Sequence, residues 1–137
     1  MVSKTSLFAI VILFNLISVS FAIKAIISGR LKCNETDLTG VKVSICDGRS
    51  SKDPAATGKS DSDGRFALTV QLQDTNHYFR ASIYHNCTLN GTEEVYTRQR
   101  TYTIPNTTPY PNYTPQLPFG DIQLFNATIT GNFTQCN

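Results

Sequence analysis

The chain has 137 residues, of which 40% are hydrophobic, and a formal net charge of +2 at pH 7. This length fits a single domain, and the 12 basic and 10 acidic residues form no long run of one sign. The balance argues against nucleic-acid binding, because a surface that follows phosphates needs a clear local excess of Lys and Arg.

The first 22 residues have the pattern of a secretory signal peptide. Lys4 supplies a positive start, and an apolar run extends from Leu7 to Val19. Ser20-Phe21-Ala22 then places small residues where signal peptidase requires them. We therefore expect cleavage after residue 22, which leaves one mature domain over residues 23–137.

The alternative for this segment is an uncleaved membrane anchor. Residues 5–23 carry no charged side chain, and a bilayer needs about 20 apolar residues. Asn15 and the serines weaken this alternative, and a good cleavage site follows the apolar run. We expect a secreted, extracellular protein with no stable membrane span after cleavage, although association with the cell surface stays open.

The first part of the mature chain predicts two strands. Residues 23–32 begin apolar and β-branched, which favours a strand, and residues 34–40 form a turn. Apolar and polar residues then alternate over residues 41–46, as in a half-buried strand. In that register Cys46 points away from the core.

Further strands follow a polar loop over residues 47–55. A short segment at 57–60 leads to Asp61-Ser62-Asp63-Gly64, which has the residue chemistry of a tight turn. The next strand, residues 65–71, places its apolar residues on one face. Calcium is the alternative for the two aspartates, but an EF-hand loop needs more acidic positions and a distal Glu, which are absent.

The second half predicts strands over residues 78–84, 96–104 and 121–128. A proline-rich stretch, residues 105–118, predicts an extended loop between the last two. No segment after the leader shows a convincing helical apolar period. Short strands separated by turns therefore predict an all-β sandwich of about seven strands.

All four cysteines lie in the mature part, and export places them where disulfides form. Four thiols allow three pairings, which the spacing does not decide. The disulfide candidates are Cys33, Cys46, Cys87 and Cys136. A metal site is a weak alternative, because His85 and Cys87 with the distant His77 make a poor zinc set; we expect no metal and no cofactor.

The mature chain is rich in N-glycosylation sequons. Asn-x-Thr occurs repeatedly with no proline at the middle position, more often than the Ser and Thr content explains. Each occupied site must project into water and marks surface outside the core. The seven candidate acceptors are Asn34, Asn86, Asn90, Asn106, Asn112, Asn126 and Asn132.

Several short motifs along residues 26–136 resemble, in order and combination, the nematode transthyretin-like secreted proteins. They are Gly29-Arg30-Leu31-Lys32-Cys33-Asn34, Gly40-Val41-Lys42-Val43, Asp53-Pro54, Gly58-Lys59-Ser60-Asp61-Ser62-Asp63-Gly64-Arg65-Phe66, Ile83-Tyr84-His85-Asn86-Cys87, Thr103-Ile104-Pro105, Phe119-Gly120-Asp121-Ile122-Gln123-Leu124 and Cys136. The resemblance implies a transthyretin-like (prealbumin-like) β-sandwich, export from the cell, and binding of an unidentified protein, lipid or small-molecule ligand.

The resemblance also bears on the cysteines. Tyr96 stands where the family usually has a cysteine, and Cys46 is extra. Strands that run as in the family would place Cys33, Cys87 and Cys136 near one end of the sandwich and Cys46 near the other. This arrangement implies a disulfide between Cys33 and Cys136, and leaves Cys46 and Cys87 joined to each other, to another chain, or free.

No catalytic motif is apparent in the sequence. Hydroxyisourate hydrolase, an enzyme of this fold, would need a pocket of histidine and arginine and a C-terminal Tyr-Arg-Gly-Ser, whereas this chain ends in residues 133–137, Phe-Thr-Gln-Cys-Asn. No nucleophile elbow or paired acid and base carboxylates are present. We therefore expect a secreted binding glycoprotein, not an enzyme. The alternatives are a structural or matrix-associated glycoprotein, a carrier that holds a ligand between subunits, and a hydrolase of this type.

Overall fold

The computed structural model describes residues 23–49, 51–72, 78–102, 114–127 and 133–137. The signal peptide predicted for residues 1–22 lies outside these ranges. Within them, every regular element is a β-strand. No helix in the described part is long and apolar enough to cross a membrane.

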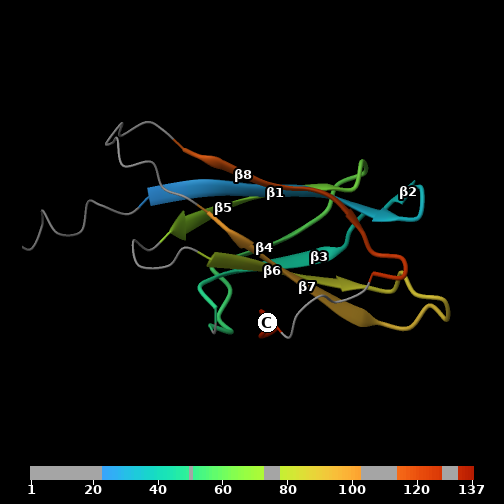
Figure 1. The fold of residues 1–137 in the computed structure, drawn as a ribbon. Helices are drawn as coiled ribbons and strands as arrows, with labels where there is room; N and C mark the ends of the chain where they lie inside the picture. Colours follow the sequence, from blue (N-terminus) through green and yellow to red (C-terminus); the bar gives the residue numbers. More distant parts are fainter. Residues whose placement is uncertain (1–22, 50, 73–77, 103–113, 128–132) are drawn as a thin grey trace, which may run out of the picture.

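The strands form two four-stranded sheets that lie one above the other (Figure 1). In sheet A, β1 is central: β5 pairs with it antiparallel on one side, β8 pairs parallel on the other, and the short β2 extends its far end. Sheet B has the order β4-β3-β6-β7 and is antiparallel throughout. The strands are β1 (Ile23–Cys33), β2 (Thr36–Asp37), β3 (Lys42–Asp47), β4 (Ala56–Lys59), β5 (Arg65–Leu72), β6 (Tyr78–His85), β7 (Glu94–Thr101) and β8 (Gln116–Gln123).

The core lies between the two sheets and follows the two-residue alternation of the strands. Phe79 packs edge-on against Phe119 from the opposite sheet, with 5.1 Å between ring centroids. The all-β sandwich is thus confirmed, and the short β2 within the predicted turn 34–40 brings the described strands to eight. The core cluster comprises Ala25, Ile27, Leu31, Val43, Ile45, Phe66, Val70, Phe79, Ala81, Ile83, Cys87, Tyr102, Phe119, Ile122 and Leu124.

Strand β8 begins earlier than predicted, inside the proline-rich stretch. The Ile26 N–H donates to the Pro115 carbonyl at 2.9 Å, and Ile26 pairs with Gln116. Successive residues of a strand direct their main-chain groups to opposite sides, so Gln116 and Pro118 face away from β1. Pro118 therefore costs no hydrogen bond of the ladder, and this edge position tolerates it.

The C-terminal segment, residues 133–137, lies on the outer face of sheet B (Figure 1). The Cys136 N–H donates to Ser82 Oγ at 2.8 Å, and the Tyr84 hydroxyl donates to the Cys136 carbonyl oxygen. Cys46 of β3 pairs with Arg80 of β6 on this same outer face. It points away from the sandwich core as predicted, but the segment covers it completely.

This placement corrects the expected disulfides. Cys46 is bonded to Cys136, and Cys33 is bonded to Cys87, so a Cys33–Cys136 pair is wrong. The expectation failed because the chain end crosses sheet B instead of remaining near Cys33. The two bonds close loops with sequence separations of 54 and 90, and the chain-entropy model gives each about 4 to 5 kcal/mol.

Candidate binding surface

The turn before β5 is held by the Asp61 carboxylate. Its Oδ1 accepts hydrogen bonds from the main-chain N–H groups of Asp63 and Arg65, each at 2.9 Å. Gly64 has a φ of 75°, and a Cβ there would lie 2.6 Å from the Leu31 carbonyl oxygen. A residue other than glycine would therefore clash with β1 as well as strain the backbone.

The same contacts bear on the calcium alternative. One carboxylate oxygen of Asp61 already accepts hydrogen bonds from the main chain of the turn. Across the described ranges, no group of three or more His, Cys, Asp or Glu side chains could hold a metal ion. In this geometry the two aspartates act as turn residues, and the turn positions the first residue of β5.

Arg30 on β1 is fixed by an acidic partner. Its Nε donates to Asp37 Oδ1 at 3.1 Å, and its Nη2 donates to Asp37 Oδ2 at 2.8 Å. The Nε also donates to the Asp63 carbonyl at 3.1 Å. The side-chain hydrogen bond is the main cause that raises the pKa of Arg30 and lowers the pKa of Asp37. This two-pronged contact orients the guanidinium across the sheet.

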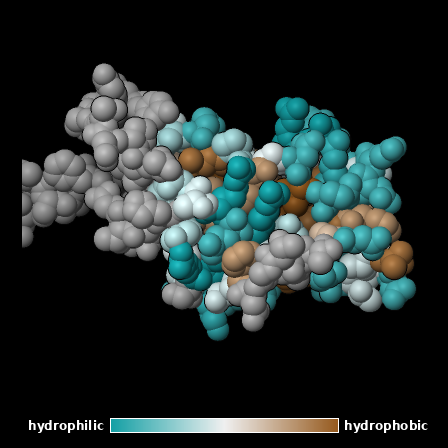
Figure 2. Space-filling model, in the orientation of Figure 1, coloured by the Kyte–Doolittle hydropathy of each residue, from teal (hydrophilic) through white to brown (hydrophobic). Residues whose placement is uncertain are grey.

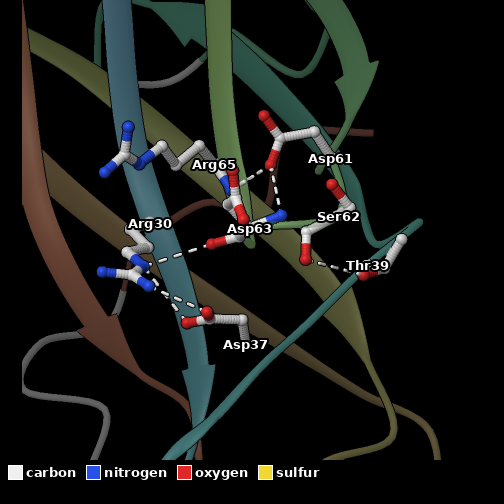
Figure 3. A network of polar contacts seen from close by, with 7 residues as sticks. All are labelled: Arg30, Asp37, Thr39, Asp61, Ser62, Asp63 and Arg65. Atoms are coloured by element: carbon white, nitrogen blue, oxygen red, sulfur yellow. Dashed lines mark hydrogen bonds and ion pairs between the residues drawn. The ribbon is translucent and has the colours of Figure 1, made fainter.

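Arg65 lies directly opposite Arg30 in the β1–β5 register, so both side chains project from the same face (Figure 3). Arg65 is exposed, and its guanidinium has no hydrogen bond or ion pair to any described residue. Like charges opposite each other on a sheet repel. The charge of Arg30 is offset by Asp37, whereas that of Arg65 is left for solvent or a ligand.

A bulge in β8 places a third charged group on this face. Where Ser28–Arg30 of β1 faces Pro118–Asp121, β8 contains one residue more, and Gly120 there has a φ of 74°. An extra residue re-aims the side chains that follow it. Asp121 is consequently exposed beside the arginine pair, while Phe119, two positions earlier, stays in the core.

These residues line an open hollow of about 470 Å³ on the outer face of sheet A, which we call the sheet A hollow. Its lining combines the small residues Ser28, Gly29 and Ala67 with two arginines and two aspartates. Such a site can bind an anion at Arg65 and hydrogen-bond a polar neighbour. The lining comprises Ser28, Gly29, Arg30, Asp61, Arg65, Phe66, Ala67, Pro118, Gly120 and Asp121.

Four of the seven predicted glycosylation sites lie in described residues, and all four asparagines are exposed. They gather at one end of the sandwich. Asn34 and Asn86 are each adjacent in sequence to a cysteine of the Cys33–Cys87 disulfide. Asn90 lies in the same loop as Asn86, between β6 and β7. The Gln123 side chain bonds both main-chain groups of Asn34, which brings the start of the Asn126 turn to the same end. Asn106, Asn112 and Asn132 lie outside the described residues.

The histidine and cysteine weighed for zinc have other partners. His85 Nδ1 accepts a hydrogen bond from the Cys87 N–H at 3.0 Å, and Cys87 Sγ is bonded to Cys33. Burial lowers the pKa of His85, and the nearby Glu94 opposes that shift. His77 lies outside the described residues.

Sequence reasoning missed two features. The first is the Arg30–Asp37 contact, which depends on the short β1–β2 hairpin that was expected to be a plain turn. The second is Arg80, which is completely buried on the outer face of sheet B. Arg80 is the only charged residue among the apolar residues of β6, which indicated a buried guanidinium. Such a group needs hydrogen-bond acceptors nearby.

The fold agrees with a comparison with known protein families. A family model described as "TTR-52: Transthyretin-like family" matches residues 28–105, more than half of the chain. This chain belongs to the transthyretin-like family. The matched part of this transthyretin-like chain holds Arg30, the turn before β5 and Cys33, Cys46 and Cys87, whereas Cys136 lies beyond it.

Other comparisons add little for this transthyretin-like chain. Curated proteins give no match. Among solved structures it is similar to a 9R-lipoxygenase from Cyanothece PCC8801, with 13% identity and a TM-score of 0.42. The similarity covers 74% of this chain and only 16% of the lipoxygenase.

Proposed function

We propose that this transthyretin-like chain is a secreted, N-glycosylated recognition protein that acts outside the cell without catalysis. It binds an anionic group of an extracellular protein, lipid or small molecule in the sheet A hollow. The observation that carries the proposal is the exposed Arg65 guanidinium, which has no described partner and lies opposite the ordered Arg30. Arginine recognises carboxylate and phosphate groups through paired N–H donors.

The described surface as a whole also favours a polar ligand. Figure 2 shows hydrophilic residues over most of the described surface in that view, with hydrophobic residues scattered among them. Among the residues whose exposure the structure describes, Leu89, at 79%, is the one large hydrophobic residue that is exposed. The described surface thus lacks the contiguous apolar patch by which a purely apolar partner would dock.

Features at the Cys33–Cys87 end of the sandwich support export and glycosylation. Leu89 lies between the sequons of Asn86 and Asn90, so glycans there would cover an otherwise exposed apolar side chain. The two disulfides suit an oxidising compartment.

The disulfides favour a recognition role over a cross-linked matrix role. All four cysteines of the chain are paired within it, and none is free. The matrix alternative relied on a spare cysteine for bonds between chains. The described histidine, His85, is buried and bonded to the Cys87 main chain, which makes it a poor general base at the surface.

The experiment measures retention of the purified secreted protein on beads that carry carboxylate, phosphate or sulfate groups. Arg65→Ala removes the uncommitted guanidinium, and Lys59→Ala is the matched control, since it removes one exposed positive charge from sheet B. We expect the unaltered protein and Lys59→Ala to be retained on at least one resin at physiological salt, and Arg65→Ala to elute early. Equal elution of the two variants, or no retention of the unaltered protein, would reject the proposal.

A further inference from the structure

The sequon at Asn86 contains a disulfide-bonded cysteine at its middle position. The tripeptide is Asn86-Cys87-Thr88, and Cys87 is bonded to Cys33 with 5.8 Å between their Cα atoms. Asn86 is exposed whereas Cys87 is buried at 5% exposure. One residue of the tripeptide is therefore anchored in the sandwich while its neighbour is the acceptor for a glycan.

The folded turn also occupies the other recognition groups of this sequon. Thr88 Oγ1 donates to the Thr92 carbonyl at 3.1 Å and lies 3.2 Å from Thr92 Oγ1. The Thr88 N–H donates to the Asn86 carbonyl at 2.9 Å, and the Cys87 N–H donates to the His85 ring. A sequon requires its hydroxyl residue, and in this folded turn the Thr88 hydroxyl that the transferase must contact is already engaged by Thr92.

We propose that the Cys33–Cys87 disulfide closes the Asn86 sequon, so that glycosylation of Asn86 must precede oxidation of Cys87. A transferase has to draw the tripeptide into its own active site, and the covalent link to β1 prevents Cys87 from leaving the sandwich. A glycan that is added first fits the folded protein, because Asn86 is exposed. The two modifications therefore compete in time, although both fit the finished structure.

Each step is chemically complete with reactants of the export pathway. In glycosylation, Asn86 Nδ2 loses one proton and forms a bond to the anomeric carbon of a lipid-linked sugar, and the lipid pyrophosphate leaves. In oxidation, the Cys33 and Cys87 thiols lose two protons and pass two electrons to a disulfide-bearing oxidant, which becomes a dithiol. The inference rests on the proposed export of the chain.

The test compares site occupancy by glycopeptide mass spectrometry in secretory cells that express the full chain. Cys33→Ser removes the disulfide and leaves the Asn86 tripeptide unchanged. Cys46→Ser is the matched control, because it removes the other disulfide. Asn126, whose sequon contains no cysteine, is the internal reference. Intracellular and secreted protein are both analysed, so a variant that fails to leave the cell still gives a result.

We expect the unoccupied fraction of Asn86 to fall at least twofold in Cys33→Ser and to stay unchanged in Cys46→Ser, with Asn126 constant in both. A membrane-permeant dithiol added to cells that make the unaltered protein gives the same fall. Complete occupancy of Asn86 in the unaltered protein, no change in Cys33→Ser, or an equal change in Cys46→Ser would overturn the inference. Absence of glycan from every site, Asn126 included, would instead overturn the proposed export and the inference with it.

Discussion

The Arg80 guanidinium donates a hydrogen bond to the main-chain carbonyl oxygen of Thr134, which lies 54 positions later in the chain. It also donates to the carbonyl of Gly48 at 2.9 Å and to that of Ser51. The side chain is completely buried, and burial lowers the pKa of Arg80. One buried cation thus joins β6, the loop after β3 and the C-terminal segment.

Arg80→Met is expected to destabilise the protein by about 3 kcal/mol, because the buried Gly48 carbonyl and the part-buried carbonyls of Ser51 and Thr134 lose their donor. Arg80→Lys should restore little, since an ammonium cannot reach three carbonyls with the planar geometry of a guanidinium. Urea unfolding measures the loss. Arg98→Met removes a half-buried arginine as the control, and an equal free energy of unfolding for Arg80→Met and Arg98→Met would contradict the role of Arg80.

Gly64→Ala separates a steric clash from backbone strain. Both Gly64 and Gly91 have positive φ, at 75° and 68°, but only Gly64 has neighbours within 4 Å of an added Cβ. Gly91→Ala should cost about 1 kcal/mol from strain alone, and Gly64→Ala should cost more, up to about 3 kcal/mol. Thermal unfolding of the two variants gives the comparison. A larger loss for Gly91→Ala would show that the turn does not dock on β1 as described.

Folding stability should fall in mild acid because of His85. Its Nδ1 accepts the Cys87 N–H only while the ring is neutral, and burial lowers its pKa from the ordinary value of 6.5. The unfolded chain therefore binds a proton more readily than the folded one. The contribution of His85 is complete above pH 6.5 and is lost as pH falls below that value toward the folded pKa.

Melting temperatures from about pH 7.5 to about pH 5 test this pH dependence. His85→Asn, whose amide oxygen can replace the Nδ1 acceptor without titrating, should flatten the profile. His77→Gln serves as the control and should keep the slope of the unaltered protein. A His85→Asn profile as steep as that of the unaltered protein would assign the acid sensitivity to other groups.

Asp37→Asn should strengthen anion binding in the sheet A hollow. The Asp37 carboxylate holds two N–H groups of Arg30 at 3.1 and 2.8 Å, and the variant frees positive charge beside Arg65. We expect later elution from the resin that retains the unaltered protein. Stability should change little, because both side chains of the pair are partly exposed. Earlier elution would mean that the ligand does not meet Arg30.

The strands with clear alternation could be predicted from sequence, because alternating apolar and polar residues show which side chains of a half-buried strand face the core. Val43, Ile45, Phe66 and Val70 lie in the core as their two-residue period indicated. The start of β8 could not be predicted from sequence. Pro115 and Pro118 fit a strand only when its parallel partner and its free edge are known. The local pattern carries no information about that long-range pairing.

The candidate site was harder to predict than the fold. The turn before β5 was recognisable, but the opposition of Arg30 and Arg65 depends on the register of β1 and β5. The prediction of the disulfide pairing was wrong for a similar reason. Nothing in the local sequence of Cys136 indicates that the chain end crosses sheet B to reach Cys46, and the Thr134 acceptor of Arg80 becomes visible only with that crossing.

The central claim is that the sheet A hollow is the ligand-binding surface. Its most direct test is a map of NMR chemical-shift changes in the glycan-trimmed protein, titrated with the soluble form of the anion that the resin assay selects. We predict saturable changes centred on Ser28, Arg30, Arg65 and Asp121, and none on the outer face of sheet B. Changes centred on sheet B, or no saturable change at all, would contradict the account.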